Sequence, residues 1–233
     1  MNSFIERLDS AIQEYALLSH PFYQAWNAGT LTNETLREYA QQYYQFERAF
    51  PTYVSAVHSN TEDAVIRQHL LENLIDEEGT GNNTSVSHPE LWLRFAEAVG
   101  CNRDAVKNAT PFAETNALRE TMRELTKNGD TIEGLSALYG YESQIPEVSR
   151  TKIQGLRKFY GVTTTNGLAF FRVHEKADEW HSQTEREMLA ALVTSPEDEE
   201  RAINAARSSA KAIYDMLTGV VRECSVECEM LPA

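Results

Sequence analysis

Apolar residues recur three and four positions apart along nearly the whole chain, which places them on one face of an α-helix. No run of four to eight β-branched residues alternates with polar residues, as a half-buried strand requires. The pattern therefore predicts an all-α fold.

Glycine, proline and short polar clusters divide this pattern into about seven or eight helices. One long helix is expected from about Asn33 to Ser59, with a kink at Pro51, and Ser195 followed by Pro196 is typical of the start of the last helix. Loops or turns are expected at 79–87, 100–102, 108–111, 128–131 and 161–166. Because no repeat or long linker interrupts the chain, residues 1–233 are expected to form a single domain.

The charge balance limits the kinds of partner that the chain can bind. The chain has 21 Lys and Arg against 35 Asp and Glu, a formal net charge of -14, which repels nucleic acid and anionic lipid. No segment reaches transmembrane length, and the first twenty residues lack the apolar core of a signal peptide. Cys101, Cys224 and Cys228 form no CxxC pair, which favours free thiols in the cytoplasm, and no function is assigned to them.

Three potential metal ligands share one helical face in the segment FFRVHEKADEWH: His174, Asp178 and His181. At i, i+4 and i+7 they fall within about 60° of one another and span about 10 Å of the helix axis. The apolar stripe of the helix continues on both sides of them, so they point toward the core, where unpaired polar groups are costly. Two histidines and a carboxylate suit a first-row metal with open positions, as in non-haem iron oxygen chemistry. A solvated or ion-paired face is the alternative.

Further candidate ligands lie in other segments. Glu142 continues an apolar stripe in SALYGYESQ, so its carboxylate is also aimed inward, although a tyrosine or arginine in the core would satisfy it equally well. Glu77 and Glu78 both keep the apolar spacing of their helix, and periodicity does not choose between them. His88 follows the polar loop and opens the next helix, where it is either a ligand or an ordinary first residue.

Together these segments offer three carboxylates and three imidazoles, enough for two metal ions with vacant positions for dioxygen: Glu77, His88, Glu142, His174, Asp178 and His181. Ferritin-like sites use Glu-x-x-His pairs on two helices, so this site would differ from them. The remaining histidines lack carboxylates at ligand spacing and are expected in packing or surface roles: His20, His58 and His69.

The combined motifs resemble the family of the chlamydial protein associating with death domains. The likeness runs from about Phe4 to Leu192 and is carried by HPFYQAW, YAQQYYQFERAFPTYVSAVHS, NLIDEE, ALYGYESQIPEVSRTKIQGL and FFRVHEKADEWH. Relatives of this family include the pyrroloquinoline-quinone synthesis protein C and thiaminase-like proteins. The resemblance implies a haem-oxygenase-like helical bundle, and it selects Glu77 over Glu78 among the six metal ligands.

The resemblance also implies an unusual activity, the oxygen-dependent formation of para-aminobenzoate, the folate precursor, from one of the protein's own tyrosines. By motif position the consumed residue is Tyr23 in HPFY, and Lys152 in SRTKIQGL is the source of the amino nitrogen. The implied cofactor is a mixed iron and manganese pair, with two irons as the alternative, used with dioxygen and an external reductant. A homodimer is the fold-level expectation.

The spacing of Lys152 along its helix gives little support for its role as the amine donor. Ten residues beyond Glu142, it would lie about 15 Å along a straight helix and roughly 80° around it, so it would not face the same ion. Pro146 could redirect the segment by kinking or unwinding it, and a surface lysine is the alternative.

Several tyrosines are candidates for a supporting role. Tyr39, Tyr43 and Tyr141 are either radical relays or packing residues, since an aromatic stripe at helical spacing is usually core. Tyr39 and Tyr141 are retained as candidate catalytic residues. The family pattern has a tyrosine at the position of Phe170, so any relay that uses it must follow another path here.

Two other functions compete with this hypothesis. The same ligands would suit a catalytic oxygenase or oxidative decarboxylase acting on a free small molecule. A protein that binds death domains is the third alternative, but nothing in the sequence identifies such a surface.

Overall fold

The computed structural model of the protein describes residues 3–80 and 85–226. Within these residues it has twelve α-helices, a 3-10 turn η1 (Leu17–Ser19), a π-helical turn η2 (Glu124–Asn128) and no strand. The α-helices are α1 (Phe4–Gln13), α2 (Pro21–Ala28), α3 (Asn33–Glu47), α4 (Phe50–Asn60), α5 (Ala64–Glu78), α6 (His88–Ala98), α7 (Arg103–Asn108), α8 (Ala113–Arg123), α9 (Thr131–Glu142), α10 (Ile145–Phe159), α11 (Ala169–Leu192) and α12 (Pro196–Glu223). The all-α prediction is confirmed.

The predicted number of helices, seven or eight, is wrong because several of the expected helical segments are divided, among them the first one, which forms α1 and α2. The expected helix 33–59 breaks after Glu47, and Pro51 lies in the first turn of α4, where a missing N–H costs nothing. A second break, between Glu142 and Ile145, separates α9 from α10 beside Pro146, where the sequence had left a kink or unwinding open. The start of α12 is as expected, since the Ser195 side chain accepts a hydrogen bond from the backbone N–H of Asp198.

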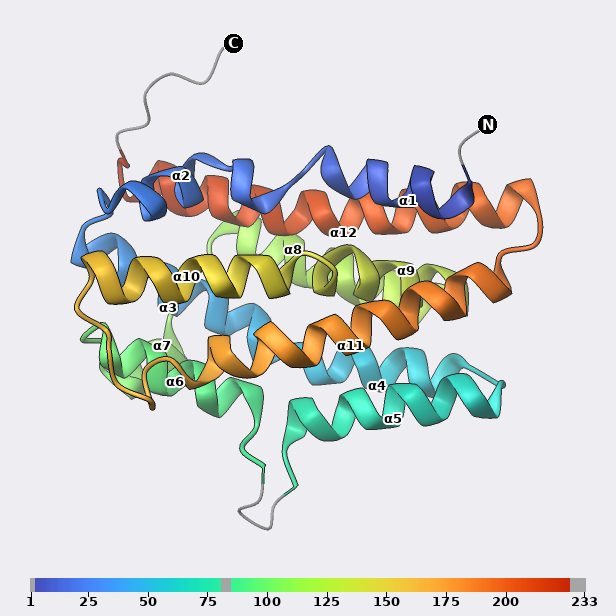
Figure 1. Cartoon of the computed structure of the whole chain (residues 1–233), viewed down its shortest axis with the longest axis horizontal. Helices are drawn as coiled ribbons and strands as arrows, with labels where there is room; N and C mark the ends of the chain where they lie inside the picture. Colours follow the sequence, from blue (N-terminus) through green and yellow to red (C-terminus); the bar gives the residue numbers. More distant parts are fainter. Residues whose placement is uncertain (1–2, 81–84, 227–233) are drawn as a thin grey trace.

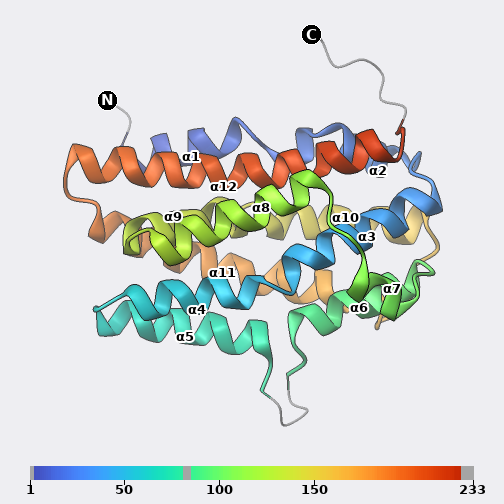
Figure 2. The same cartoon turned by 180° about the vertical axis from the view of Figure 1, so that it is seen from behind.

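The helices pack in layers along the long axis of the molecule (Figure 1 and Figure 2). Helices α1, α2 and α12 form one side, α8, α9 and α10 lie beneath α12, and α4, α5 and α6 form the opposite side. Helix α11 packs against α10, α9, α6 and α5. One face of α11 is thus buried against several other helices, while its opposite face carries exposed residues such as Trp180.

Small residues let α9 and α12 approach closely. A Cβ on Gly140 would lie 2.6 Å from the carbonyl oxygen of Ala206, so only glycine fits at this crossing. The Ser209 hydroxyl donates to the Ala137 carbonyl at 2.7 Å across the same contact. This contact fixes α9, which carries Glu142 at its end.

The membrane-span and cysteine predictions can be compared with the described residues. No helix within 3–80 and 85–226 is long and apolar enough to cross a membrane. Cys101 and Cys224 are half-buried free thiols. Cys228 and residues 81–84 of the expected loop 79–87 lie outside the described residues.

Candidate metal centre

Four helices bring the six predicted ligands into the interior. Glu77 lies at the end of α5, His88 at the start of α6 and Glu142 at the end of α9, while α11 contributes the other three. Each of the six is at most 5% exposed: Glu77, His88, Glu142, His174, Asp178 and His181. The chain therefore buries six ionisable side chains around α11.

One half of this cluster joins α5, α6 and α11. The His88 Nδ1 lies 2.9 Å from the Glu77 Oε1. The rings of His88 and His174 have their centroids 4.2 Å apart. The His174 Nδ1–H donates to the Phe170 carbonyl at 2.8 Å, which fixes the tautomer and leaves Nε2 with a lone pair for a metal ion.

The other half gathers carboxylates that repel one another. The Asn73 side-chain amide donates to the Glu142 Oε1 at 3.0 Å. Burial, followed by the carboxylates of Glu142 and Glu77, raises the pKa of Asp178 well above its usual range. Burial raises the pKa of Glu142 as well, and burial together with Glu142 raises that of Glu185 well above its usual range. A cation would relieve this repulsion.

Atoms without a hydrogen-bond partner support the same conclusion. Within the described residues, the buried oxygens Glu77 Oε2 and Asp178 Oδ2 have none. The Glu142 carboxyl is hydrogen-bonded to Glu185, and His181 Nε2 lies 3.3 Å from the half-exposed Asp76 Oδ2. Buried polar atoms are normally paired, so a group of unpaired ligand atoms calls for an explanation. Imidazole and carboxylate donors fit first-row divalent metals, and the residues present therefore fit a metal centre.

Two buried carboxylates of this region were missed by the sequence analysis. Ligand atoms of Glu47, His88 and His174 all lie within 4.8 Å of one another, so Glu47 on α3 can also hold a metal ion. Glu185 follows His181 by one turn of α11 and is 2% exposed. Both could have been found, because Glu47 continues the aromatic stripe of α3 and Glu185 extends the stripe of predicted ligands.

Lys152 lies inside the protein, so of the two alternatives left by the sequence the redirected segment is found and the surface lysine is not. Because the chain breaks between α9 and α10, the Lys152 side chain is turned into the core and is 2% exposed. Its Nζ donates to the Tyr39 hydroxyl at 2.7 Å. Five rings surround Nζ with centroids 5.0 to 5.6 Å away: Tyr23, Tyr39, Tyr43, Trp92 and Phe171.

This aromatic cage changes the acidity of Lys152. Burial lowers the pKa of its amine to about 7, while the Glu47 carboxylate acts in the opposite direction. The Tyr23 hydroxyl lies 3.5 Å from that of Tyr39, and the ring of Tyr23 is 5.4 Å from the Lys152 Nζ. An amine that is partly neutral near neutral pH thus lies beside two buried phenols.

The other tyrosines connect this cage to the ligand cluster. The hydroxyls of Tyr43 and Tyr141 share a hydrogen bond, and both residues are buried. Phe170 stacks on His174 with centroids 3.9 Å apart, so an aromatic ring is retained there without its hydroxyl. Tyr39 contacts the Lys152 amine, and Tyr141 directly precedes Glu142 on α9.

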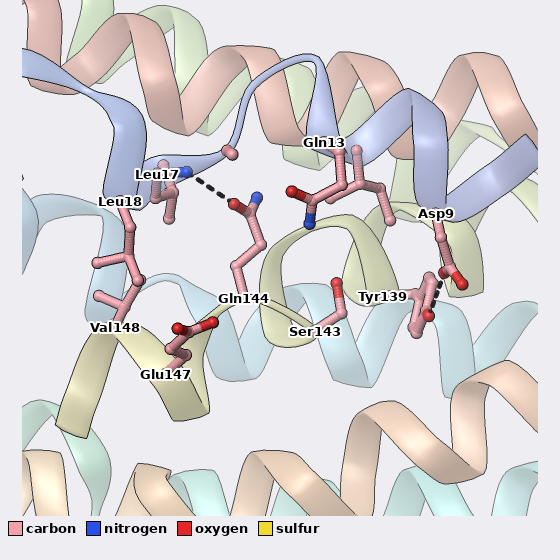
Figure 3. Close-up of a pocket in the computed structure, with 11 residues that line it drawn as sticks. Asp9, Gln13, Leu17, Leu18, Tyr139, Ser143, Gln144, Glu147 and Val148 are labelled. Carbon is pink, nitrogen blue, oxygen red and sulfur yellow. Dashed lines mark hydrogen bonds between the residues drawn. The ribbon is translucent and has the colours of Figure 1, made fainter. Parts of the chain in front are cut away.

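A separate polar cavity of about 450 Å³ lies between α1 and the break that follows α9 (Figure 3). The Tyr139 hydroxyl donates to Asp9 at 2.6 Å, and the Leu17 N–H donates to the Gln144 Oε1 at 2.9 Å. None of the predicted site residues lines this cavity. Its hydrogen bonds instead hold the break that turns Lys152 inward.

Comparisons with known proteins agree with the motifs. A family model described as an iron-containing redox enzyme matches residues 37–214. The chain is similar to a 4-aminobenzoate synthase of Nitrosomonas europaea, with 41% identity over 94% of this chain and 91% of that protein. It is also similar to a 4-aminobenzoate synthase of Chlamydia muridarum, with 36% identity over 92% of this chain and 89% of that protein.

Comparison with solved structures agrees with the fold expected from the sequence. A domain with a haem-oxygenase-like fold from Shewanella denitrificans superposes with a TM-score of 0.79, at 18% identity, over 94% of this chain and 91% of that one. The haem-oxygenase-like fold expected from the sequence is confirmed, and so is the resemblance to the chlamydial family.

Proposed function

We propose that this chain, which belongs to the family of iron-containing redox enzymes, forms 4-aminobenzoate from its own Tyr23 with Lys152 as the amine donor. The observation that carries the proposal is the buried Lys152 amine, which lies 2.7 Å from the Tyr39 hydroxyl and 5.4 Å from the Tyr23 ring. A lysine with only a surface role would keep its amine in water, because burial of an amine costs free energy.

The chemistry that the proposal requires is demanding. The bond between the α and β carbons of the tyrosine must break, the benzylic carbon must be oxidised to a carboxyl group, and nitrogen must replace the phenolic oxygen. A strong oxidant and an amine must therefore both reach one ring. Tyr23 is 1% exposed, so bulk water is excluded from that ring.

The residues around Lys152 lower the pKa of its amine and hold the amine in place. With a pKa of about 7, a substantial fraction of the amine is neutral near neutral pH and has a free lone pair. The hydrogen bond to Tyr39 holds Nζ in place, and the Tyr39 hydroxyl links it to Tyr23. Lys152 thus has both the position and the protonation state of an amine donor.

The metal centre would be held by the six predicted ligands, with His174 binding through Nε2 because its Nδ1 donates to Phe170. Bound iron and manganese would supply, with dioxygen and an external reductant, the oxidising power that the reaction needs. Glu47 is close to His88 and His174 and also interacts with the Lys152 charge, so it would link the metal centre to the amine.

The direct test is a single-turnover assay on metal-loaded protein. Protein labelled with ε-15N-lysine is incubated with Fe(II), Mn(II), a reductant and oxygen. The expected result is 15N-labelled 4-aminobenzoate together with a lower mass of the peptide that contains Tyr23. Tyr23→Phe and Lys152→Met are expected to abolish the labelled product.

Tyr53→Phe is the matched control, because Tyr53 is equally buried but its hydroxyl donates to the Arg119 carbonyl, away from the site. It should leave the yield unchanged. Undiminished product from Tyr23→Phe would contradict the proposal. More than one product per chain, dependent on an added small molecule, would instead favour a catalytic oxygenase.

A further inference from the structure

A groove is lined by residues of α5 and of the second half of α11. Figure 1 shows that α5 lies on the side of the molecule opposite to α12. The groove has a volume of about 480 Å³, and apolar side chains form much of its wall, among them Val65, Met188 and Leu192. The Trp180 ring, 58% exposed, stands at its edge. The groove is therefore open to solvent while its walls belong to two helices that carry metal ligands.

A much smaller space, the throat, adjoins the groove. The throat has room for about 10 Å³, and four side chains line both spaces: His69, Trp180, Thr184 and Met188. Its inner end is formed by Asn73, His181 and Glu185. A space of this size holds a single water-sized particle, so an ion that passes must exchange water for protein atoms.

The inner end of the throat is formed by buried side chains that carry metal-ligating atoms. Within the described residues, Asn73 Oδ1 has no hydrogen-bond partner, while the Glu185 carboxyl shares a hydrogen bond with Glu142 and His181 Nε2 lies 3.3 Å from the Asp76 Oδ2. These side chains are 2%, 3% and 5% exposed for Glu185, Asn73 and His181. They present ligand atoms to the throat from α5 and α11.

The outer end carries an imidazole. His69 precedes Asn73 by one turn of α5, and its Nδ1 is 3.8 Å from the half-exposed Glu72 carboxylate. On α11, His181 and Glu185 are also one turn apart. Donor groups therefore follow one another at helical spacing from the mouth of the groove to the candidate metal centre.

We propose that this throat is the route by which divalent metal ions reach the centre, with His69 as the first protein ligand and Glu185 as the receiving carboxylate. The inference rests on the proposed metal-dependent function. Imidazole, amide oxygen and carboxylate are ligands for first-row divalent ions, whereas dioxygen gains nothing from such donors. The net charge of -14 also attracts cations to the surface.

The test measures metal uptake rather than activity. Metal-free protein is mixed rapidly with Co(II), and the visible absorption of bound cobalt is followed in time. His69→Leu removes the first ligand and Thr184→Leu narrows the throat, so both should slow uptake several-fold without changing the final stoichiometry. Trp180→Ala, at an exposed position, should widen the mouth and speed uptake.

His58→Leu is the matched control, because this half-buried histidine lies on α4 and lines neither the groove nor the throat. It should load at the wild-type rate. If His69→Leu and Thr184→Leu also load at that rate, or Trp180→Ala is not faster, the route is wrong although the metal centre stands. Wild-type protein that binds no Co(II) would overturn the proposed metal-dependent function as well.

Discussion

Two buried histidines, His20 and His174, differ in the hydrogen bonds of their rings, and this difference separates a structural residue from a ligand. The Nδ1 of His20 accepts from the Phe22 N–H at 3.0 Å, and its Nε2 is 3.0 Å from the Thr218 hydroxyl. Both nitrogens are therefore used within the fold. His174 donates only through Nδ1, to the Phe170 carbonyl, and keeps its other nitrogen for the buried cluster.

His20 should make the fold sensitive to mild acid. Burial lowers the pKa of His20 to about 4 from an ordinary value of 6.5. The folded state keeps the imidazole neutral, while the unfolded chain takes up a proton below pH 6.5, so stability is full above that pH and falls toward pH 4. The free energy of unfolding should drop by about 2 kcal/mol between pH 7 and pH 5 from this residue alone.

Urea unfolding of wild type and His20→Asn at these two pH values measures this contribution. Asparagine can cap α2 in place of the imidazole but cannot be protonated. The variant should lose about 2 kcal/mol less than wild type over this interval. Equal pH dependence in the two proteins would show that His20 is protonated without cost in the folded state.

The sequence identified ligands where one helix carries several of them. His174, Asp178 and His181 stand out because three polar groups on an apolar stripe need a common partner. Glu47 was missed because Tyr39 and Tyr43, which precede it on the same stripe, were interpreted as packing residues. The burial of Lys152 could not be predicted from spacing, since its side chain is turned inward by a backbone break.

That break, between α9 and α10, is the element on which the site depends. Pro146 falls in the first turn of α10, and the Gln144 side chain before it is held by the Leu17 N–H of the η1 turn. A contact between residues 127 positions apart in the sequence thus stabilises the break. Local patterns predict helices well, but they carry no information on such contacts, so the helix count was too low.

The crossing of α9 and α12 should be sensitive to a single methyl group. In Gly140→Ala the new Cβ would lie 2.6 Å from the Ala206 carbonyl oxygen, a backbone atom that cannot rotate away. The helices must separate, and overpacking of this kind typically costs about 1–3 kcal/mol. Because alanine otherwise favours helices, the intrinsic gain of about 1 kcal/mol partly offsets this cost.

Chemical denaturation of wild type and Gly140→Ala gives the difference in the free energy of unfolding. A net loss would support the tight crossing, whereas a net gain would mean that the helices separate without cost. Since Glu142 ends the same helix, the variant should also bind Co(II) more weakly than wild type.

For the molecule as a whole, the buried ionisable cluster should make metal-free protein less stable than loaded protein. Ligands that bind only the folded state stabilise it, by about 3 kcal/mol at a concentration about 100 times Kd. For a chain of 233 residues this corresponds to a rise in Tm of about 10 °C. Calorimetry of chelator-treated protein, with and without added Mn(II), measures the rise.

The pH dependence of that rise distinguishes the buried cluster from surface binding. Burial raises the pKa values of Asp178, Glu142 and Glu185, so their protons compete with the metal as the pH falls. The rise in Tm should therefore be larger at pH 7.5 than at pH 5.5. His174→Ala should reduce it strongly, and His58→Leu should not. An equal rise in wild type and His174→Ala would place the bound metal outside the cluster, because His174 is 2% exposed and cannot hold a surface ion.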